Sequence, residues 1–170
     1  MSFEGHGRGV MDAQFGRNED VIYTASQDKT LKAWKASTGV CMHTFSAGHT
    51  DWVWTCLVSH DDTFLLSGSS DTSILVWNAG SGAVHKEVKQ HENWVMSLQW
   101  VNPTQFLSGS DDKTIKLFTW PACDVVRTFL GHNNTVRSIS VAGDGLHFFS
   151  GSFDKSVKLW RTDATEPLLT

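Results

Sequence analysis

Serine, histidine and aspartate, the residue types of hydrolytic catalytic triads, recur together along this chain. A histidine is followed about twenty residues later by a Ser-x-Asp triplet, and this happens four times in 170 residues. Such a set could activate a serine nucleophile, with histidine as the base and aspartate orienting the histidine. Eight histidines and three cysteines also raise the hypothesis of a metal site. Both chemistries depend on how these residues are spaced.

The spacing is that of an internal repeat. The triplet aspartates recur at intervals of 43, 41 and 42 residues, as do the aromatic residues six positions after them. The upstream histidines recur at intervals of 43, 42 and 41 residues, and each is followed four positions later by a valine. A period near 42 residues with several short strands per unit indicates the blade of a β-propeller. We expect one repeat domain over residues 1–170, with repeats at about 5–45, 46–88, 89–129 and 130–170.

Each repeat is predicted to hold four strands, which makes the fold all-β with four-stranded antiparallel blades. The second strand ends at the triplet serine and the third ends at the aromatic residue. Turn-forming residues separate the first and second strands, as at Gly143-Asp144-Gly145. The expected first strands are residues 9–15, 52–58, 94–100 and 135–141, and the expected fourth strands are residues 40–45, 83–88 and 123–129.

These units resemble the repeats of the WD-repeat family of β-propellers. Each carries a histidine, then Ser-x-Asp, then a strand that ends in Trp or Phe, and the resemblance covers nearly the whole chain. The Trp-Asp pair that names the family is absent. The aromatic residue is followed instead by Lys35, Asn78, Thr119 or Arg161.

The resemblance implies one buried hydrogen-bonded tetrad of His, Ser or Thr, Asp and Trp in each blade. A buried polar group without a partner costs about 1–3 kcal/mol, so the four groups stabilise a blade only as a satisfied set. Phe118 replaces the tryptophan of the third repeat and brings no indole N–H, so that tetrad is predicted to be the loosest. The expected tetrads are His6, Ser26, Asp28 and Trp34; His49, Ser69, Asp71 and Trp77; His91, Ser110, Asp112 and Phe118; and His132, Ser152, Asp154 and Trp160.

This structural role is favoured over catalysis or metal binding. The triplet serine is expected inside the blade with no oxyanion site beside it, so the likeness to a triad is superficial. No glycine-rich phosphate loop and no His-Glu-x-x-His motif occurs in the sequence. We therefore expect no catalytic residue, no metal and no cofactor. The other histidines fall at unrelated points of the repeat and lack the spacing of zinc ligands: His43, His60, His85 and His147.

The charge and composition of the chain narrow the classes of partner that it is expected to bind. The net charge is -4, which disfavours a nucleic-acid partner. No apolar run approaches the ~20 residues of a membrane span, and no signal peptide is visible, so no membrane partner is expected. Cys41, Cys56 and Cys123 are odd in number and unclustered. They fit small apolar residues of a reducing compartment, which predicts the cytoplasm, with the nucleus as the alternative.

The resemblance also implies where a partner binds. In this family the first strands line the central channel, and partners often contact the residues beside the repeated valine and the residue before the tetrad aspartate. Tryptophan, methionine and arginine at these positions match the residues that dominate interface hot spots. The alternative is that Trp54 and Trp94 fill gaps between blades. The predicted partner-binding residues are Met11, Gln27, Trp52, Trp54, Ser70, Trp94, Met96, Asp111, Arg137 and Phe153, with Gly9 and Thr135 at equivalent positions.

The sequence therefore predicts a non-catalytic protein–protein interaction scaffold that binds a protein or peptide on the top face of the propeller. A purely structural assembly unit is one alternative. An enzyme or small-ligand propeller that uses the central channel is another, and it would need polar residues converging there. Only Arg137 and Asp111 are charged among the candidates.

Four repeats leave the closure of the ring open. Residues 1–4 resemble the end of a fourth strand, and residues 166–170 the start of one. Joining residue 170 to residue 1 would place the next histidine 16 residues after Trp160, against 15, 14 and 14 inside the chain. An open arc would expose an apolar blade face and strand edges. We expect two chains to join head to tail as an eight-bladed homodimer. A four-bladed ring and a piece of a longer protein are the alternatives.

Overall fold

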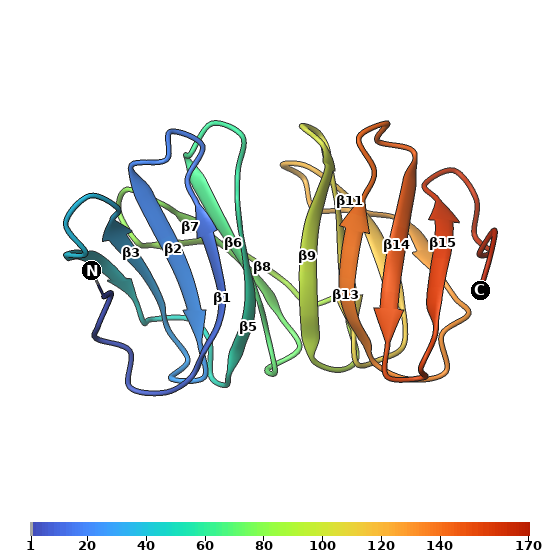
Figure 1. The fold of residues 1–170 in the computed structure, drawn as a ribbon, viewed down its shortest axis with the longest axis horizontal. Coiled ribbons are helices and arrows are strands. Elements are labelled where there is room, and N and C mark those ends of the chain that lie inside the picture. The colour runs from blue at the N-terminus through green and yellow to red at the C-terminus, as the bar shows by residue number, and fades with distance from the viewer. Residues whose placement is uncertain (1) are drawn as a thin grey trace. The chain divides into compact units, whose positions relative to one another are not determined.

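A computed structural model describes residues 2–170 as a succession of short β-strands (Figure 1). Each strand is antiparallel to its neighbour, and the order within every sheet follows the chain. No helix occurs among these residues, and so none is long and apolar enough to cross a membrane. The all-β prediction is confirmed.

The first compact unit, residues 1–89, holds two four-stranded sheets, which we call blades 1 and 2. Blade 1 comprises β1 (Val10–Phe15), β2 (Val21–Ser26), β3 (Leu31–Lys35) and β4 (Cys41–Phe45). Blade 2 comprises β5 (Val53–Val58), β6 (Phe64–Ser69), β7 (Ile74–Asn78) and β8 (Val84–Val88). Met1 lies outside the described residues, and residues 2–4 of the fourth-strand end expected at residues 1–4 form no strand.

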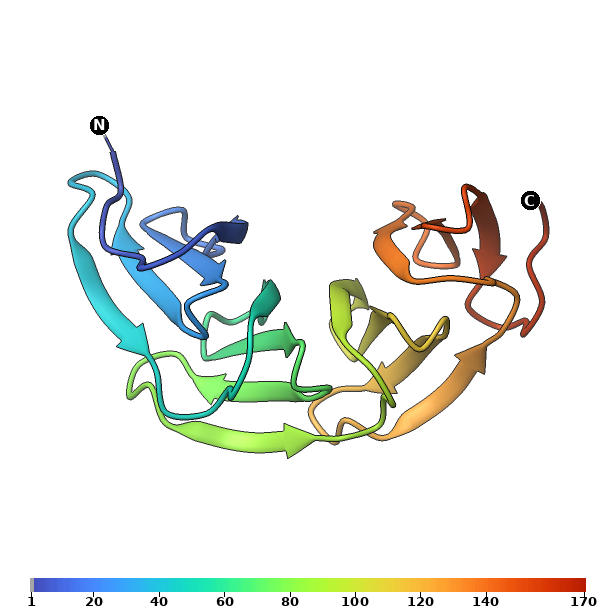
Figure 2. The ribbon, with the colours of Figure 1, turned by 90° about the horizontal axis from the view of Figure 1, so that it is seen from below.

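The second compact unit, residues 90–170, holds blades 3 and 4. Blade 3 comprises β9 (Val95–Asn102), β10 (Gln105–Ser110), β11 (Ile115–Thr119) and β12 (Val125–Phe129). Blade 4 comprises β13 (Val136–Val141), β14 (His147–Ser152) and β15 (Val157–Arg161). Figure 2 shows the strands of these two blades following one another in chain order.

The expected fourth strand of the fourth repeat, at residues 166–170, is reduced to a single bridge between Leu159 and Leu169. Its position still matches that of the other fourth strands. Lys158 Nζ donates to Thr170 Oγ1 at 2.9 Å, as Lys32 Nζ donates to Thr44 Oγ1 at 2.8 Å in blade 1. The expected strand at residues 123–129 starts later, at Val125, because Cys123 has a φ of 57° and breaks the extended run.

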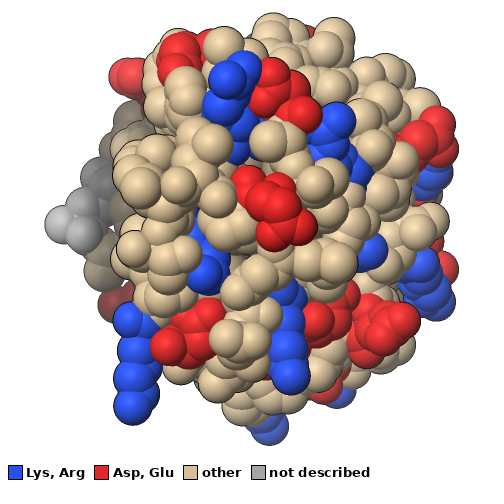
Figure 3. Space-filling model, turned by 90° about the vertical axis from the view of Figure 1, so that its right-hand side faces the viewer, with Lys and Arg blue, Asp and Glu red and all other residues tan. Residues whose placement is uncertain are grey.

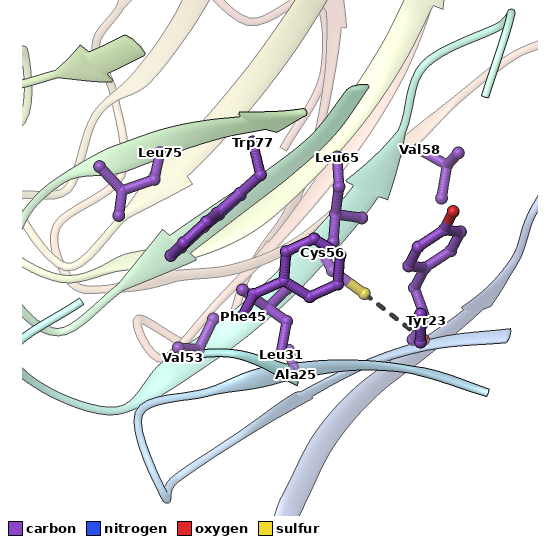
Figure 4. Packing of buried hydrophobic residues seen from close by; sticks show 11 residues of the cluster. Tyr23, Ala25, Leu31, Phe45, Val53, Cys56, Val58, Leu65, Leu75 and Trp77 are labelled. Carbon is purple, nitrogen blue, oxygen red and sulfur yellow. Dashed lines mark hydrogen bonds between the residues drawn. The ribbon is translucent and has the colours of Figure 1, made fainter. Parts of the chain in front are cut away.

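The core of the first unit lies between its two blades. The inner face of blade 1 presents Tyr23, Ala25, Leu31 and Ala33, all buried. Strand β5 covers this face, and Figure 4 shows Val53 beside Leu31 and Val58 beside Tyr23. The thiol of Cys56 reaches the Tyr23 carbonyl at 3.8 Å, the contact drawn dashed in Figure 4.

The second unit repeats this packing with other residues. Leu107, Ile115 and Leu117 of blade 3 are buried against β13, whose Val136 is fully buried. Ile139 and Val141 pack on the same cluster. Strands buried on both faces explain why the second and third strands alternate so little in sequence.

Candidate functional site

Every blade pairs its histidine with its turn aspartate. The histidine Nδ1 lies within hydrogen-bond distance of the aspartate Oδ2 in all four copies. The backbone N–H of the residue after the histidine donates to the same oxygen, as Gly7 N does to Asp28 at 2.8 Å. The Nδ1–Oδ2 distances are 2.8 Å for His6 and Asp28, 2.8 Å for His49 and Asp71, 2.6 Å for His91 and Asp112, and 2.7 Å for His132 and Asp154.

The other ring nitrogen of each histidine meets a hydroxyl two residues before the one that the sequence indicated. His49 Nε2 lies 2.6 Å from Ser67 Oγ, and Trp77 Nε1 donates to that same oxygen at 2.8 Å. If Nδ1–H donates to the carboxylate, Nε2 accepts the serine proton and the serine accepts the indole proton. Each of these side-chain polar atoms then has a partner. The hydroxyls in this role are Thr24, Ser67, Ser108 and Ser150.

The expected tetrad serines, Ser26, Ser69, Ser110 and Ser152, are therefore corrected. They close the turn instead: Ser69 Oγ donates to the Asp51 carbonyl at 3.2 Å and accepts from Asp71 N at 3.1 Å. The reason is register. Trp77 pairs with Leu65, so its diagonal neighbour on the same face is Ser67, two residues short of the strand end. Hydroxyl residues occupy both positions in all four repeats, so the sequence offered two candidates of equal chemistry.

A fifth polar residue joins each tetrad and was missed in the sequence. Two positions after the aspartate stands a threonine or serine whose hydroxyl donates to Oδ1 at 2.6 Å and whose backbone N–H donates to the same oxygen at 2.9–3.0 Å. The signal was present, because all four repeats carry a hydroxyl there: Thr30, Ser73, Thr114 and Ser156.

Blade 3 keeps the chain of bonds without the indole. Phe118 is fully buried and stacks on Phe106 with ring centroids 4.9 Å apart. Ser108 Oγ still meets His91 Nε2 at 2.6 Å but has no indole donor, because Phe118 carries none. The looseness expected of this tetrad stays a prediction.

The turn aspartates are held as carboxylates. Burial alone would raise the pKa of Asp71, but the hydrogen bonds from His49 and Ser73 outweigh it and hold the pKa well below its ordinary value. The pKa of Asp28, Asp112 and Asp154 is lowered in the same way, with burial opposing and hydrogen bonds from histidine and hydroxyl prevailing. An ionised acceptor strengthens each bond that it receives.

The connectivity of aspartate, histidine and hydroxyl is that of a hydrolytic triad, but its placement differs. Ser67 and Ser108 are fully buried and Ser150 is 1% exposed. In blades 1, 2 and 4 the hydroxyl oxygen also accepts an indole N–H, so no side of it faces solvent or a substrate. Within residues 2–170, no group of three or more His, Cys, Asp and Glu side chains could hold a metal ion. The arrangement serves to fasten the strands of a blade together.

The partner-binding candidates of the first unit form an ordered aromatic pair. The rings of Trp52 and Trp54 meet edge to face with centroids 5.7 Å apart. Trp54 Nε1 donates to Ser70 Oγ at 2.7 Å. Ser70 itself is buried, so it positions Trp54 and offers little contact surface. Met11 and Gln27 are half-buried.

The candidates of the second unit divide into buried and exposed groups. Phe153 is 60% exposed and Trp94 is 41% exposed. Met96 is buried and offers no contact surface. Asp111 accepts a hydrogen bond from the hydroxyl of Thr135, so this carboxylate ties blade 3 to blade 4. Arg137 is half-buried.

Repeated antiparallel sheets, each fastened by one buried Asp–His–hydroxyl chain and stacked within its unit through a first strand, define a repeat protein built from propeller-type blades. The family described as "WD domain, G-beta repeat" (WD40) matches residues 1–35, 39–78, 82–119 and 123–161. The chain therefore belongs to the WD40 family, and the resemblance seen in the sequence is confirmed.

The individual relatives named below share less than a third of the aligned residues with this chain. Nuclear distribution protein nudF of Emericella nidulans is 28% identical over 94% of this chain and 41% of its own length. Nuclear distribution protein PAC1 of Arthroderma otae is 31% identical over 83% of this chain and 35% of its own length. Protein tipD of Dictyostelium discoideum is 27% identical over 96% of this chain and 26% of its own length. The chain thus spans well under half the length of these relatives.

Proposed function

We propose that this protein is a non-catalytic scaffold that binds a protein or peptide partner through the residues at the start of its first strands. We call these residues the strand-one rim of each unit: Trp52 and Trp54 at the start of β5 in the first unit, and Trp94 before β9 with Phe153 in the turn after β14 in the second unit. The polar groups of the tetrads are largely buried and mutually satisfied, whereas Trp94 and Phe153 of the rim are exposed and Trp52 and Trp54 are half-buried. Membership of the WD40 family supports a protein partner.

The observation that carries the proposal is the Trp52–Trp54 pair. Trp54 is fixed by its bond to Ser70 and holds Trp52 edge to face. Rigid aromatic anchors lose little conformational freedom on binding, which is why they dominate hot spots. One such tryptophan contributes about 2 kcal/mol or more, roughly thirtyfold in affinity.

The experiment compares the wild type with a Trp52→Ala/Trp94→Ala double variant in affinity capture followed by mass spectrometry. Capture of the specific partner is expected to fall at least roughly thirtyfold in affinity, since one hot-spot residue already accounts for that much. A Val126→Ala variant, which shortens an exposed side chain of β12 outside the rim, serves as the control and should capture normally. A large fall in melting temperature with unchanged capture would show that the two tryptophans are structural.

The relatives point to where the partner should be sought. Two of the relatives are named nuclear distribution proteins. We propose that the partner of this chain be sought first among proteins that act in nuclear distribution. We propose a cytoplasmic location, which is consistent with that process. The three cysteines are all free thiols, as expected in a reducing compartment.

We also propose that two chains complete one eight-bladed ring head to tail. Light scattering at micromolar concentration is expected to give twice the 18.9 kDa of a single chain. The mass of one chain would contradict the ring.

A further inference from the structure

Blade 4 carries an apolar face that the other blade of its unit leaves partly exposed. Phe149 of β14 is 48% exposed and Val157 of β15 is 62% exposed. They occupy the repeat positions of Leu107 and Ile115 in blade 3, which are 0% and 1% exposed under β13. In blade 1 the same positions are Tyr23 and Leu31, buried under β5. Blade 4 therefore presents the surface that blades 1 and 3 bury inside their units.

Blade 1 presents the complementary surface. Val10 is 51% exposed and Phe15 is 60% exposed, although both lie on the first strand of a sheet. The equivalent residues of blade 2, Val53 and Val58, are buried against blade 1. One molecule thus exposes both halves of an interface that it forms twice internally, once in each unit.

We propose that the face of blade 4 formed by Phe149 and Val157 binds the face of blade 1 formed by Val10 and Phe15 in a second copy of this chain. This inference rests on the proposed head-to-tail ring and assigns the surfaces that meet in it. The pairing follows the first unit, where Val53 lies beside Leu31 and Val58 beside Tyr23 (Figure 4). By position, Val10 of one copy meets Val157 of the other, and Phe15 meets Phe149.

Polar contacts between blades support the same register. Asp12 Oδ2 accepts the backbone N–H of Cys56 at 3.0 Å, and Ser97 Oγ accepts that of Ile139 at 3.2 Å. The acceptor stands two positions after the repeated valine, and the donor stands three positions after the valine of the next blade. In blade 4 the acceptor position is Ser138, which is exposed. Its predicted donor is the backbone N–H of Ala13 in the second copy, which exchanges its 2.8 Å bond to Asp12 Oδ1 of its own chain for this contact.

A lysine side chain makes a further contact between neighbouring blades, and its equivalent is present at the proposed interface. Lys29 Nζ, in the turn after the aspartate of blade 1, donates to the Thr50 carbonyl of blade 2 at 2.8 Å. Lys155 occupies the same turn position in blade 4, and Gly7 the position of Thr50. Lysine and arginine side chains lie among aspartate and glutamate on the face drawn in Figure 3, so no charge of one sign dominates that face.

The test uses two charged variants and their combination. Val157→Glu places a carboxylate in the proposed contact, where burial without a partner is strongly unfavourable. Val10→Lys places an ammonium group there from the other side. Each single variant is expected to give the 18.9 kDa mass of one chain by light scattering, against twice that mass for the wild type. In the double variant the introduced carboxylate of each copy meets the introduced ammonium group of the other, and the doubled mass is expected to return.

The control is Val126→Glu, which adds the same charge at a side chain 47% exposed on β12 of the same unit and should leave the doubled mass unchanged. Circular dichroism melts of all variants separate dissociation from unfolding. If the wild type has the doubled mass and the Val157→Glu variant keeps it, the surface assignment is overturned and the ring stands. A wild type with the mass of one chain would overturn both. Dissociation by Val126→Glu, or failure of the double variant to recover, would also refute the assigned pairing.

Discussion

The energy of the tetrad can be tested inside one compact unit by removing the shared hydroxyl from a complete and an incomplete copy. In blade 4, Ser150→Ala leaves two buried nitrogens without partners, His132 Nε2 and Trp160 Nε1, which lie 2.6 and 2.7 Å from the hydroxyl. In blade 3, Ser108→Ala leaves only His91 Nε2, because Phe118 has no N–H. Each unsatisfied buried group costs ~1–3 kcal/mol. We therefore expect the free energy of unfolding to fall by about 2–6 kcal/mol in Ser150→Ala and by about 1–3 kcal/mol in Ser108→Ala.

Urea unfolding followed by circular dichroism measures this difference, with the slopes of the two variants compared to verify the same transition. In a unit of this size each kcal/mol corresponds to about 4–8 °C in melting temperature. Ser150→Thr is the matched control, because blade 1 uses Thr24 in this role and the hydroxyl is kept. Equal losses in the two blades, or a larger loss for Ser108→Ala, would refute the argument that the indole bond stabilises the complete tetrads.

Two further predictions concern stability. The folded-state pKa of Asp28, Asp71, Asp112 and Asp154 lies below the ordinary 3.8, so their contribution is complete above that value and is lost as the pH falls through it. The urea midpoint is therefore expected to be level near pH 6 and to decline from about pH 5 downwards; a midpoint that rises on acidification would contradict this. Thr72 is a β-branched residue at a φ of 73°, where the other three blades have lysine, so Thr72→Lys should stabilise the first unit by about 1 kcal/mol in a thermal melt. An unchanged or lower melting temperature would count against strain at this turn.

The repeat made most of the fold predictable. A polar turn, a valine and an aromatic residue recur at fixed offsets, and each of these anchors reports a local requirement: a turn, the start of a first strand and a packed third strand. Strand ends were predicted less well. Cys123 adopts a positive φ that nothing in its residue type announces, and so β12 begins two residues later than expected.

The polar network shows where sequence alone was insufficient. Ser67 and Ser69 share one face of β6 and one chemistry, and only the register of β6 against β7 decides which of them meets Trp77. In the same way, burial decides which of the predicted partner-binding residues are accessible to a partner. Met96 and Ser70 occupy the same repeat positions as more exposed residues, yet both are buried, because exposure depends on neighbours that the sequence does not place beside them.

The most direct test of the account is a side-by-side measurement of melting temperature and partner capture for two variants. The Trp52→Ala/Trp94→Ala variant should keep a melting temperature near that of the wild type and lose capture. Ser150→Ala should melt at a lower temperature and, below that temperature, capture the partner normally. If Ser150→Ala abolished capture while folded, and the tryptophan variant captured normally, the division between a buried fastening network and an exposed binding rim would be wrong.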